Sequence, residues 1–316
     1  NNFLDKTIYQ QIMMGIKHVE ESVVATDLSA MAKGTKIANI PIALASAMAT
    51  ALIPGISSDF AQGDLKSVRS KVTKSVKVTM LISIPSAVGL GVLAKPVMMV
   101  IFHQPDTLEL ASMLLSCMAV TVVLYALSTL TQAILQSIGR MKAPIINASA
   151  AVVIHGVMMV LMELFLDVKY GLYSYVTVTV VYALLLCVLN QISVHRYLNY
   201  RQEIDKTFLR PLAASALMGA AAYGVYHGMN LLTKSNLVSL AAAIVLAAAL
   251  YFVLVIHWKA VSEEELRGMP KGYLLVGIAK KIGILKPEGR SSGPIKKKKK
   301  RKKRKKKKTG QTKKKI

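Results

Sequence analysis

Residues 110–139 read LASMLLSCMAVTVVLYALSTLTQAILQSIG, thirty successive residues without Asp, Glu, Lys or Arg. Roughly 20 apolar residues of helix cross a bilayer core about 30 Å thick, so this stretch is long enough to span it. Strands of membrane β-barrels alternate polar and apolar residues, and this stretch does not. Six further stretches lack charged residues, and they are 37–58, 78–94, 143–162, 170–194, 211–233 and 235–258. The sequence therefore predicts an all-α integral membrane protein, a polytopic helix bundle with seven complete transmembrane helices.

The two shortest apolar segments need separate treatment. The stretch 78–94 has only 17 residues, and we expect its helix to continue past Lys95 and Pro96 into the apolar residues 97–102. Residues 1–16 have the pattern of a helix, and we expect them to be the end of a partial first transmembrane helix that starts before Asn1. Residues 17–262 would then form the transmembrane lobe.

The basic residues are concentrated at the C-terminus. The chain of 316 residues is 53% hydrophobic and 18% charged, and 18 of its 41 Lys and Arg residues lie from Lys286 onward. We expect residues 263–295 to form a cytoplasmic amphipathic segment and residues 296–316 a disordered polybasic tail. Such a tail is attracted to anionic lipid of the inner leaflet; a solvated tail without a role and attraction to RNA are the alternatives. The body outside the tail is only mildly basic, so we do not expect nucleic acid as a partner of the protein.

The loops between the apolar stretches alternate in charge. From the first loop to the sixth they hold five, one, two, one, four and one Lys or Arg residues. Cytoplasmic loops of membrane proteins carry an excess of Lys and Arg. The alternation therefore predicts that the basic loops and the C-terminus are cytoplasmic.

The sequence offers no motif for catalysis or metal binding. The two cysteines lie inside apolar stretches, where we expect buried thiols that pack as small apolar side chains. The six histidines have no partner at ligand spacing, so we expect no metal site and no cofactor. No phosphate-binding loop or nucleophile motif occurs, and we do not expect an enzyme. The seven stretches also lack the acidic residue that ion-driven antiporters place inside the membrane.

Three phrases carry a family resemblance: LIPGISSDFAQGD at residues 52–64, IPSAVGLGVLAKPVMMVIF at residues 84–102 and AILQSIGRMKAPI at residues 133–145. In this order they resemble the oligosaccharide-flippase branch of the multidrug/oligosaccharidyl-lipid/polysaccharide exporter superfamily, in particular its stage V sporulation protein B-like and lipid II flippase-like members. The resemblance covers about residues 1–285. It implies the second, C-terminal lobe of a two-lobe MATE-like transporter, with seven complete helices and the end of an eighth, in a bacterial cytoplasmic membrane.

The resemblance implies a function that the residues alone do not. Proteins of this branch flip a lipid-linked oligosaccharide or peptidoglycan precursor across the cytoplasmic membrane by alternating access. A small-molecule or drug antiporter of the same superfamily is one alternative, and a membrane scaffold for glycan assembly without transport is another. The chain would supply one of the two lobes that enclose the central cavity, and its partners would be the lipid-linked glycan and membrane lipids.

A group of polar residues before the first proline is the candidate substrate site. Lys36 lies five residues before Pro41, and Lys33 and Asn39 lie three residues to either side of it. In lipid II flippases a cationic residue at this spacing from the proline faces the central cavity, so the resemblance implies that Lys36, Lys33 and Asn39 bind the anionic head group. Lysine offers a point charge and not the bidentate fork of arginine. The alternative is that Lys36 extends to the lipid headgroups, as lysines near helix ends commonly do.

Overall fold

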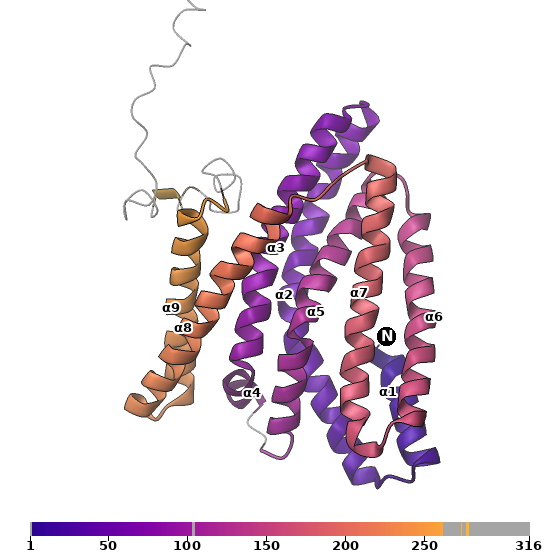
Figure 1. Cartoon of the computed structure of the whole chain (residues 1–316), viewed down its shortest axis with the longest axis vertical. Coiled ribbons are helices and arrows are strands. Elements are labelled where there is room, and N and C mark those ends of the chain that lie inside the picture. The colour runs from indigo at the N-terminus through magenta and orange to yellow at the C-terminus, as the bar shows by residue number, and fades with distance from the viewer. Residues whose placement is uncertain (1, 103–104, 262–272, 274–275, 278–316) are drawn as a thin grey trace, which may run out of the picture. The chain divides into compact units, whose positions relative to one another are not determined.

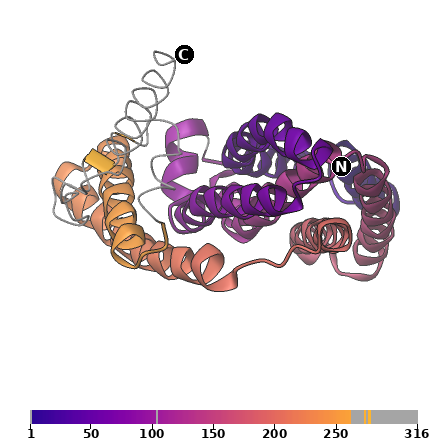
Figure 2. The same cartoon turned by 90° about the horizontal axis from the view of Figure 1, so that it is seen from above.

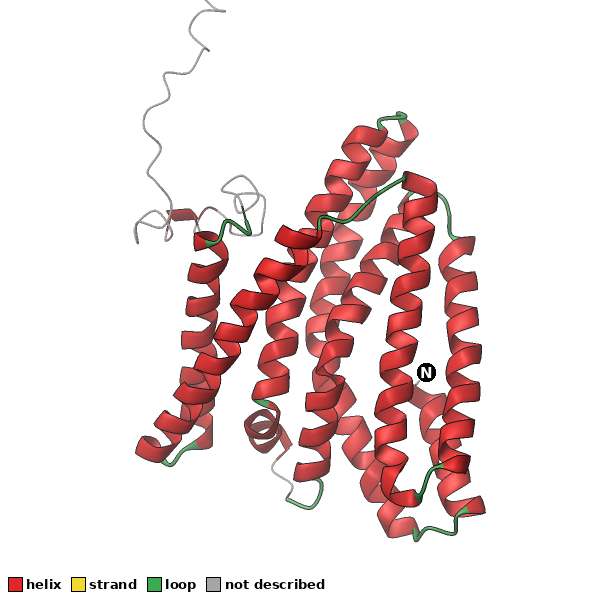
Figure 3. Ribbon diagram, viewed as in Figure 1, coloured by secondary structure: helices red, strands yellow, loops and turns green. Residues whose placement is uncertain are grey.

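The structure is a computed structural model that describes residues 2–102, 105–261, 273 and 276–277. Every regular element in this part of the chain is a helix, which confirms the all-α membrane class (Figure 3). The elements are α1 (Asn2–Gln10), the π-helical turn η1 (Gln11–Ile16), α2 (Glu21–Ala61), α3 (Leu65–Val92), α4 (Ala94–Phe102), α5 (Leu108–Ser137), α6 (Lys142–Phe165), the 3-10 turn η2 (Val168–Tyr170), α7 (Gly171–Leu198), the π-helical turn η3 (Asp205–Leu209), α8 (Arg210–Thr233) and α9 (Asn236–His257).

Six helices of the described part are long and apolar enough to cross a membrane, namely α3, α5, α6, α7 (together with η2), α8 (together with η3) and α9. They coincide with six of the seven predicted stretches. The seventh stretch, 37–58, lies within α2. At 1.5 Å per residue the 41 residues of α2 extend over about 60 Å, which exceeds the thickness of a bilayer core. That α2 is the seventh transmembrane helix stays a prediction.

The sequence predicts that the stretch 78–94 continues as one helix through residue 102. This is wrong, because the helix breaks at Leu93. Residues 94–102 form the separate helix α4, and α3 ends at Val92. Proline has no backbone N–H and therefore leaves the carbonyl four residues before it without a helical partner. Counted back from Pro96, this carbonyl belongs to Val92. The chain ends α3 at that residue and begins α4 in a new direction.

The connections between helices alternate between the two ends of the bundle (Figure 1). The turns from α2 to α3 and from α5 to α6, and the segment from α7 to α8, lie at one end. The turns from α4 to α5, from α6 to α7 and from α8 to α9 lie at the other end. The loops rich in Lys and Arg therefore share one end of the bundle, as the alternation of charge predicts.

Helix α5 is the centre of the bundle (Figure 2). It packs against α2, α3 and α7, while α1 and α6 lie at one edge and α8 and α9 at the other. Helix α8 approaches α3 closely at Gly219, where a Cβ atom would lie 2.7 Å from Val88 Cγ1. Small residues allow such approach between membrane helices. By contrast, Gly224 and Gly228 of α8 face open space.

The side chains of α5 join two apolar clusters. Toward one end Leu114 and Leu115 pack with α1, α2 and α7, and toward the other Leu130 and Ile134 pack with α3 and the end of α7. Cys187 of α7 belongs to the second cluster and is buried as expected. The expectation for Cys117 is wrong, because Cys117 is exposed. Apolar residues face lipid as readily as protein, so an apolar stretch does not reveal which of its faces is buried.

Two predicted segments lie outside the described residues. Of the amphipathic segment 263–295 only Tyr273, Val276 and Gly277 are described, and the polybasic tail 296–316 is not described. The helices α1 to α9 belong to one compact unit, Asn1–Glu265. The domain boundaries predicted from the sequence therefore stay predictions.

Candidate functional site

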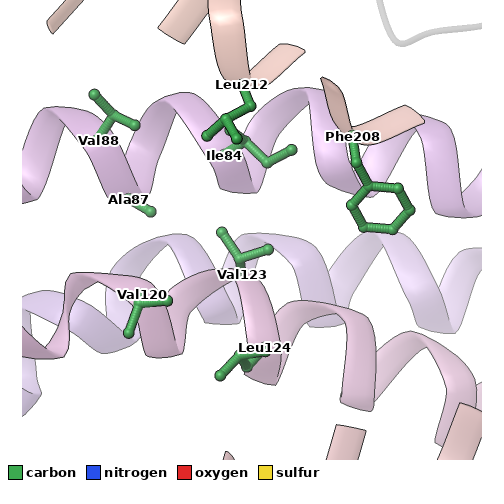
Figure 4. Close-up of a pocket in the computed structure, with 8 residues that line it drawn as sticks. All are labelled: Ile84, Ala87, Val88, Val120, Val123, Leu124, Phe208 and Leu212. Atoms are coloured by element: carbon green, nitrogen blue, oxygen red, sulfur yellow. The ribbon is translucent and has the colours of Figure 1, made fainter. Parts of the chain in front are cut away.

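An apolar groove lies between α3, α5, η3 and the first turn of α8 (Figure 4). Its volume is about 360 Å³, and every side chain that lines it is a hydrocarbon. The lining residues are Ile84, Ala87, Val88, Val120, Val123, Leu124, Phe208 and Leu212. A groove of this composition binds through the removal of apolar surface from water, and it offers no hydrogen bond to a ligand. Its chemistry suits a hydrocarbon chain.

A second, smaller pocket of about 180 Å³ lies between α2, α5 and α7, and we call it the polar pocket because six of its nine lining residues carry a hydroxyl, amide or phenol group. Apolar atoms still supply the larger part of its wall, and the lining residues are Thr35, Ala38, Asn39, Ile42, Met118, Thr121, Tyr125, Thr129 and Thr179. The hydroxyls of Thr35, Thr129 and Thr179 donate to the carbonyl four residues earlier in their own helices. Their oxygens keep lone pairs that accept hydrogen bonds from a ligand or water.

The groove and the polar pocket share the same level of α5. Val120, Val123 and Leu124 line the groove, whereas Thr121 and Tyr125 line the polar pocket. Residues four apart lie on one face of a helix, and their direct neighbours lie on another. One segment of α5 therefore presents an apolar surface on one side and a polar surface on the other, an arrangement that fits an amphiphilic ligand.

The structure separates the three predicted substrate-binding residues. Asn39 lines the polar pocket, and Lys36 is exposed one turn before it on α2. Lys33 is buried and donates a hydrogen bond to the hydroxyl of Thr107, with its ammonium 5.8 Å from the centre of the Phe102 ring. The sequence placed Lys33 on the same face as Lys36 and Asn39, but its contacts tie α2 to the segment between α4 and α5.

The phrase at residues 52–64 covers the end of α2, which stops at Ala61, and the turn to α3. Asp64 caps α3, where its Oδ1 accepts a hydrogen bond of 2.9 Å from the backbone N–H of Ser67. Lys71 of α3 reaches back to α2, with its Nζ 2.7 Å from Asp59 Oδ2 and 2.8 Å from the carbonyl of Gly55. The hydrogen bond from Lys71 holds the pKa of Asp59 below its usual value, and the hydroxyl of Ser67 acts in the same direction. These contacts make the phrase a structural turn at the basic end of the bundle.

Polar residues inside the helices form a network that the sequence did not reveal. Asn147 of α6 donates to Asn190 Oδ1 and to Ser193 Oγ of α7, each at 2.9 Å. Asn190 in turn donates to Ser128 Oγ of α5 at 3.1 Å, and it is fully buried. The network fixes α5, α6 and α7 relative to one another. A lone asparagine in an apolar stretch gives no sign of its partner, because the partner lies 43 residues or more along the chain.

The seven apolar stretches contain no acidic residue, but two acids are buried in the helices outside these stretches. Glu163 lies in the last turn of α6, fully buried, where one of its carboxylate oxygens accepts a hydrogen bond from Ser174 of α7. The other oxygen, Oε2, is buried without a hydrogen-bond partner in the structure. A second acid, Asp5 of α1, is buried against His155 in the middle of α6. The apolar stretch 143–162 ends one residue before Glu163, which is why the sequence did not show it.

Comparisons with known proteins agree with this architecture. The family model MatE matches residues 7–161. The lipid II flippase MurJ of Bacillus subtilis (strain 168) is 27% identical over 157 residues, which are 48% of this chain and 28% of the flippase. A solved structure of lipid II flippase MurJ in an inward closed conformation superposes with a TM-score of 0.58 at 18% identity, over 72% of this chain and 46% of that chain. The matched regions therefore span less than half of either relative. The resemblance drawn from the sequence is confirmed, and the solved structure shows that the fold is shared.

Proposed function

We propose that this chain, a flippase-like member of the multidrug/oligosaccharidyl-lipid/polysaccharide exporter superfamily, forms one lobe of a transporter that moves a lipid-linked oligosaccharide or peptidoglycan precursor across the bacterial cytoplasmic membrane. The observation that carries the proposal is the groove beside the polar pocket on α5. A lipid-linked glycan has a hydrocarbon tail and a polar, anionic head. The groove accommodates the tail, and the pocket accommodates part of the head.

In this proposal the two lysines of α2 have different roles, and Lys36 attracts the anionic head group. Lys36 is exposed beside the polar pocket that Asn39 lines, so its ammonium can reach a pyrophosphate bound there. Lys33 acts differently, since its ammonium is buried and bonded to Thr107. We assign Lys33 to positioning α2 against the segment between α4 and α5, and Lys36 and Asn39 to contact with the substrate.

The basic end of the bundle faces the cytoplasm in this proposal. The distribution of Lys and Arg among the loops is the support, together with their common location at one end. Cysteine labelling of the full protein in intact cells tests it. A cysteine at position 168 should react with an impermeant reagent, and a cysteine at position 66, which is exposed at the basic end, should be protected. The reverse pattern would refute the orientation.

The test of the site is a pair of substitutions in the full protein, Lys36→Ala and Lys36→Arg, scored for flipping of a lipid-linked sugar and for abundance in the membrane. Lys36→Ala should lower transport at least tenfold with normal abundance, and Lys36→Arg should retain most of it because the charge is kept. Lys169→Ala is the control, since Lys169 is exposed in η2, lines neither pocket and contacts only the ring of Tyr170 among the interactions described. Normal transport by Lys36→Ala would remove Lys36 from the site.

One observation favours the second candidate, a small-molecule antiporter of the same superfamily. Such a transporter needs a titratable group inside the membrane, and Glu163 and Asp5 are both buried within the bundle. Purified protein in vesicles separates the two candidates. Uptake of a cationic dye driven by an ion gradient, without flipping of a lipid-linked sugar, would favour the antiporter. Co-purification with a glycan polymerase, without either activity, would favour the scaffold.

A further inference from the structure

Two ionisable side chains meet inside the bundle at a place that the proposed function does not use. Nε2 of His155 lies 2.5 Å from Oδ1 of Asp5, and the two side chains are 1% and 3% exposed. His155 lies near the middle of α6, and Asp5 belongs to α1, which packs beside α6 (Figure 1). Ionisable residues deep within a membrane bundle are costly and are associated with ion or proton pathways.

Both ring nitrogens of His155 face oxygen atoms. Nε2 faces the carboxylate of Asp5, and Nδ1 lies 3.3 Å from the backbone carbonyl of Val178 on α7. A doubly protonated ring satisfies both oxygens with its two N–H groups. A neutral ring beside an ionised carboxylate has only one N–H group, so one nitrogen lone pair would face an oxygen lone pair. The geometry therefore favours the pair when it holds the additional proton.

The charge of the pair leads to the same conclusion. The loaded pair is either a carboxylate beside an imidazolium or a carboxyl group beside a neutral imidazole. Both forms hold the same number of protons and have no net charge. Removal of one proton leaves a carboxylate beside a neutral imidazole, with a net charge of −1. An uncompensated charge in a buried site destabilises the packing around it. Loss of the proton should therefore weaken the contact of α1 with α6 and α7.

The titratable groups that surround the pair are mainly phenols, which are neutral near pH 7. The ring of Tyr182 on α7 meets the ring of His155 edge-on, with 5.1 Å between centroids. Asp5 also interacts electrostatically with the hydroxyls of two further tyrosines, one on α5 and one on α7. These two tyrosines are Tyr125 and Tyr175. Tyr9 lies one turn after Asp5 on α1, where its hydroxyl donates to Asp27 of α2, and Glu163 lies two turns after His155 on α6, where it interacts electrostatically with Lys17. Apart from His155, no cation is described in contact with Asp5, so the additional proton is what balances its charge.

Aromatic rings extend from the pair to the polar pocket. The rings of Tyr182 and Tyr125 have centroids 6.2 Å apart, and Tyr125 lines the pocket together with Asn39. A metal ion does not fit between the two side chains, because a nitrogen and an oxygen 2.5 Å apart leave no room for a cation with ligand distances of about 2 Å or more on each side.

We propose that Asp5 and His155 form a proton-binding site within the transmembrane bundle. The loaded pair holds α1 against α6 and α7. When the proton leaves, the carboxylate remains beside a neutral imidazole, and the packing of α1 loosens. The protein would thereby respond to pH through the arrangement of these three helices.

Nuclear magnetic resonance of ¹⁵N-labelled histidine in the purified full chain tests the site directly. Replacement of the other five histidines by glutamine leaves His155 as the single reporter, and the substituted residues are His18, His103, His195, His227 and His257. The ring should bind or release one proton between pH 5 and pH 9, and Asp5→Asn should shift this transition by at least one pH unit. A ring in one protonation state throughout this range, or a transition unchanged by Asp5→Asn, would overturn the proposal.

Thermal unfolding gives an independent measurement. Above the unfolded pKa of histidine, about 6.5, the folded chain with the loaded pair binds one proton more than the unfolded chain, so stability should fall as the pH rises from there until the folded pair has lost its proton. The melting temperature of the wild type should therefore drop by several degrees from pH 6 to pH 9, and His155→Gln should remove most of this drop. His227→Gln, which changes an exposed histidine of α8, should keep it. A wild-type profile that is flat, or that His155→Gln leaves unchanged, would refute the site. Both measurements concern the pair itself and do not depend on which substrate is carried.

Discussion

The close approach of α8 to α3 makes a sharp prediction for Gly219. In Gly219→Ala the new Cβ would lie 2.7 Å from Val88 Cγ1 and 3.4 Å from Val92 Cγ2. Carbon atoms in favourable contact lie about 3.5–4.0 Å apart, so the two helices would have to separate by about 1 Å. Valine cannot rotate away easily, because its branched side chain has one preferred rotamer in a helix. Since Val88 also lines the groove, the separation would change the groove as well.

The matched control is Gly224→Ala in the same helix, where a Cβ atom has no neighbour within 4 Å. Both substitutions gain about 0.5–1 kcal/mol, since alanine favours a helix interior over glycine. That gain cancels when the two variants are compared. Overpacking costs about 1–3 kcal/mol, so Gly219→Ala should be less stable than Gly224→Ala by this amount.

Unfolding of the purified full chain in detergent, by titration with SDS or by heat, measures the difference. At roughly 2–4 °C per kcal/mol, the melting temperatures of the two variants should differ by several degrees. Val88→Ala removes the atom that clashes. When both glycine variants also carry Val88→Ala, the difference between their melting temperatures should therefore be much smaller. Equal stability of Gly219→Ala and Gly224→Ala would show that α8 does not approach α3 at this residue.

Three further predictions follow from single sites. Asn190→Ala should destabilise the chain by about 0.5–2 kcal/mol in the same unfolding assay, since it removes the hydrogen bonds that join α7 to Asn147 of α6 and to Ser128 of α5 through this side chain. Leu212→Gln should lower photocrosslinking of the protein to a lipid that carries a diazirine in its hydrocarbon chain. The control Leu217→Gln, which lies outside the groove, should not lower it. Equal crosslinking of the two variants would argue against a lipid tail in the groove. The pKa of Asp59 is lowered in the folded chain, first by the hydrogen bond from Lys71. Its contribution to stability is therefore present above the unfolded value of about 3.9 and is lost as the pH falls through the folded pKa, so the difference in melting temperature between wild type and Asp59→Asn should shrink below about pH 4.

The sequence by itself determined the membrane class and most of the helices. In lipid every backbone polar group needs a partner within its own segment, so a long apolar stretch has no alternative to a helix. Six predicted stretches coincide with α3 and α5 to α9 for this reason. The number of Lys and Arg residues in each loop also indicated which loops share an end, because charged loops are excluded from the bilayer core.

Only the tertiary structure decided which faces of these helices meet. Cys117 and Cys187 lie in equally apolar stretches, yet one is exposed and the other buried. Lys33 and Lys36 are one turn apart on α2, and only Lys33 is enclosed by the segment that follows α4. In a membrane helix both lipid and protein accept apolar side chains, so periodicity does not mark the packed face as it does in water.

The proton-binding pair and the groove also could not be predicted from the sequence. Asp5 and His155 are 150 residues apart in the sequence, and neither has a neighbour along the chain that would mark it as half of a site. The groove requires α8 to cross α3 at Gly219, so that Phe208 and Leu212 lie opposite Val120 of α5. Hydrophobicity and charge along one helix fix where it lies in the membrane. The partners of its polar residues depend on the positions of other helices, which only their packing against one another determines.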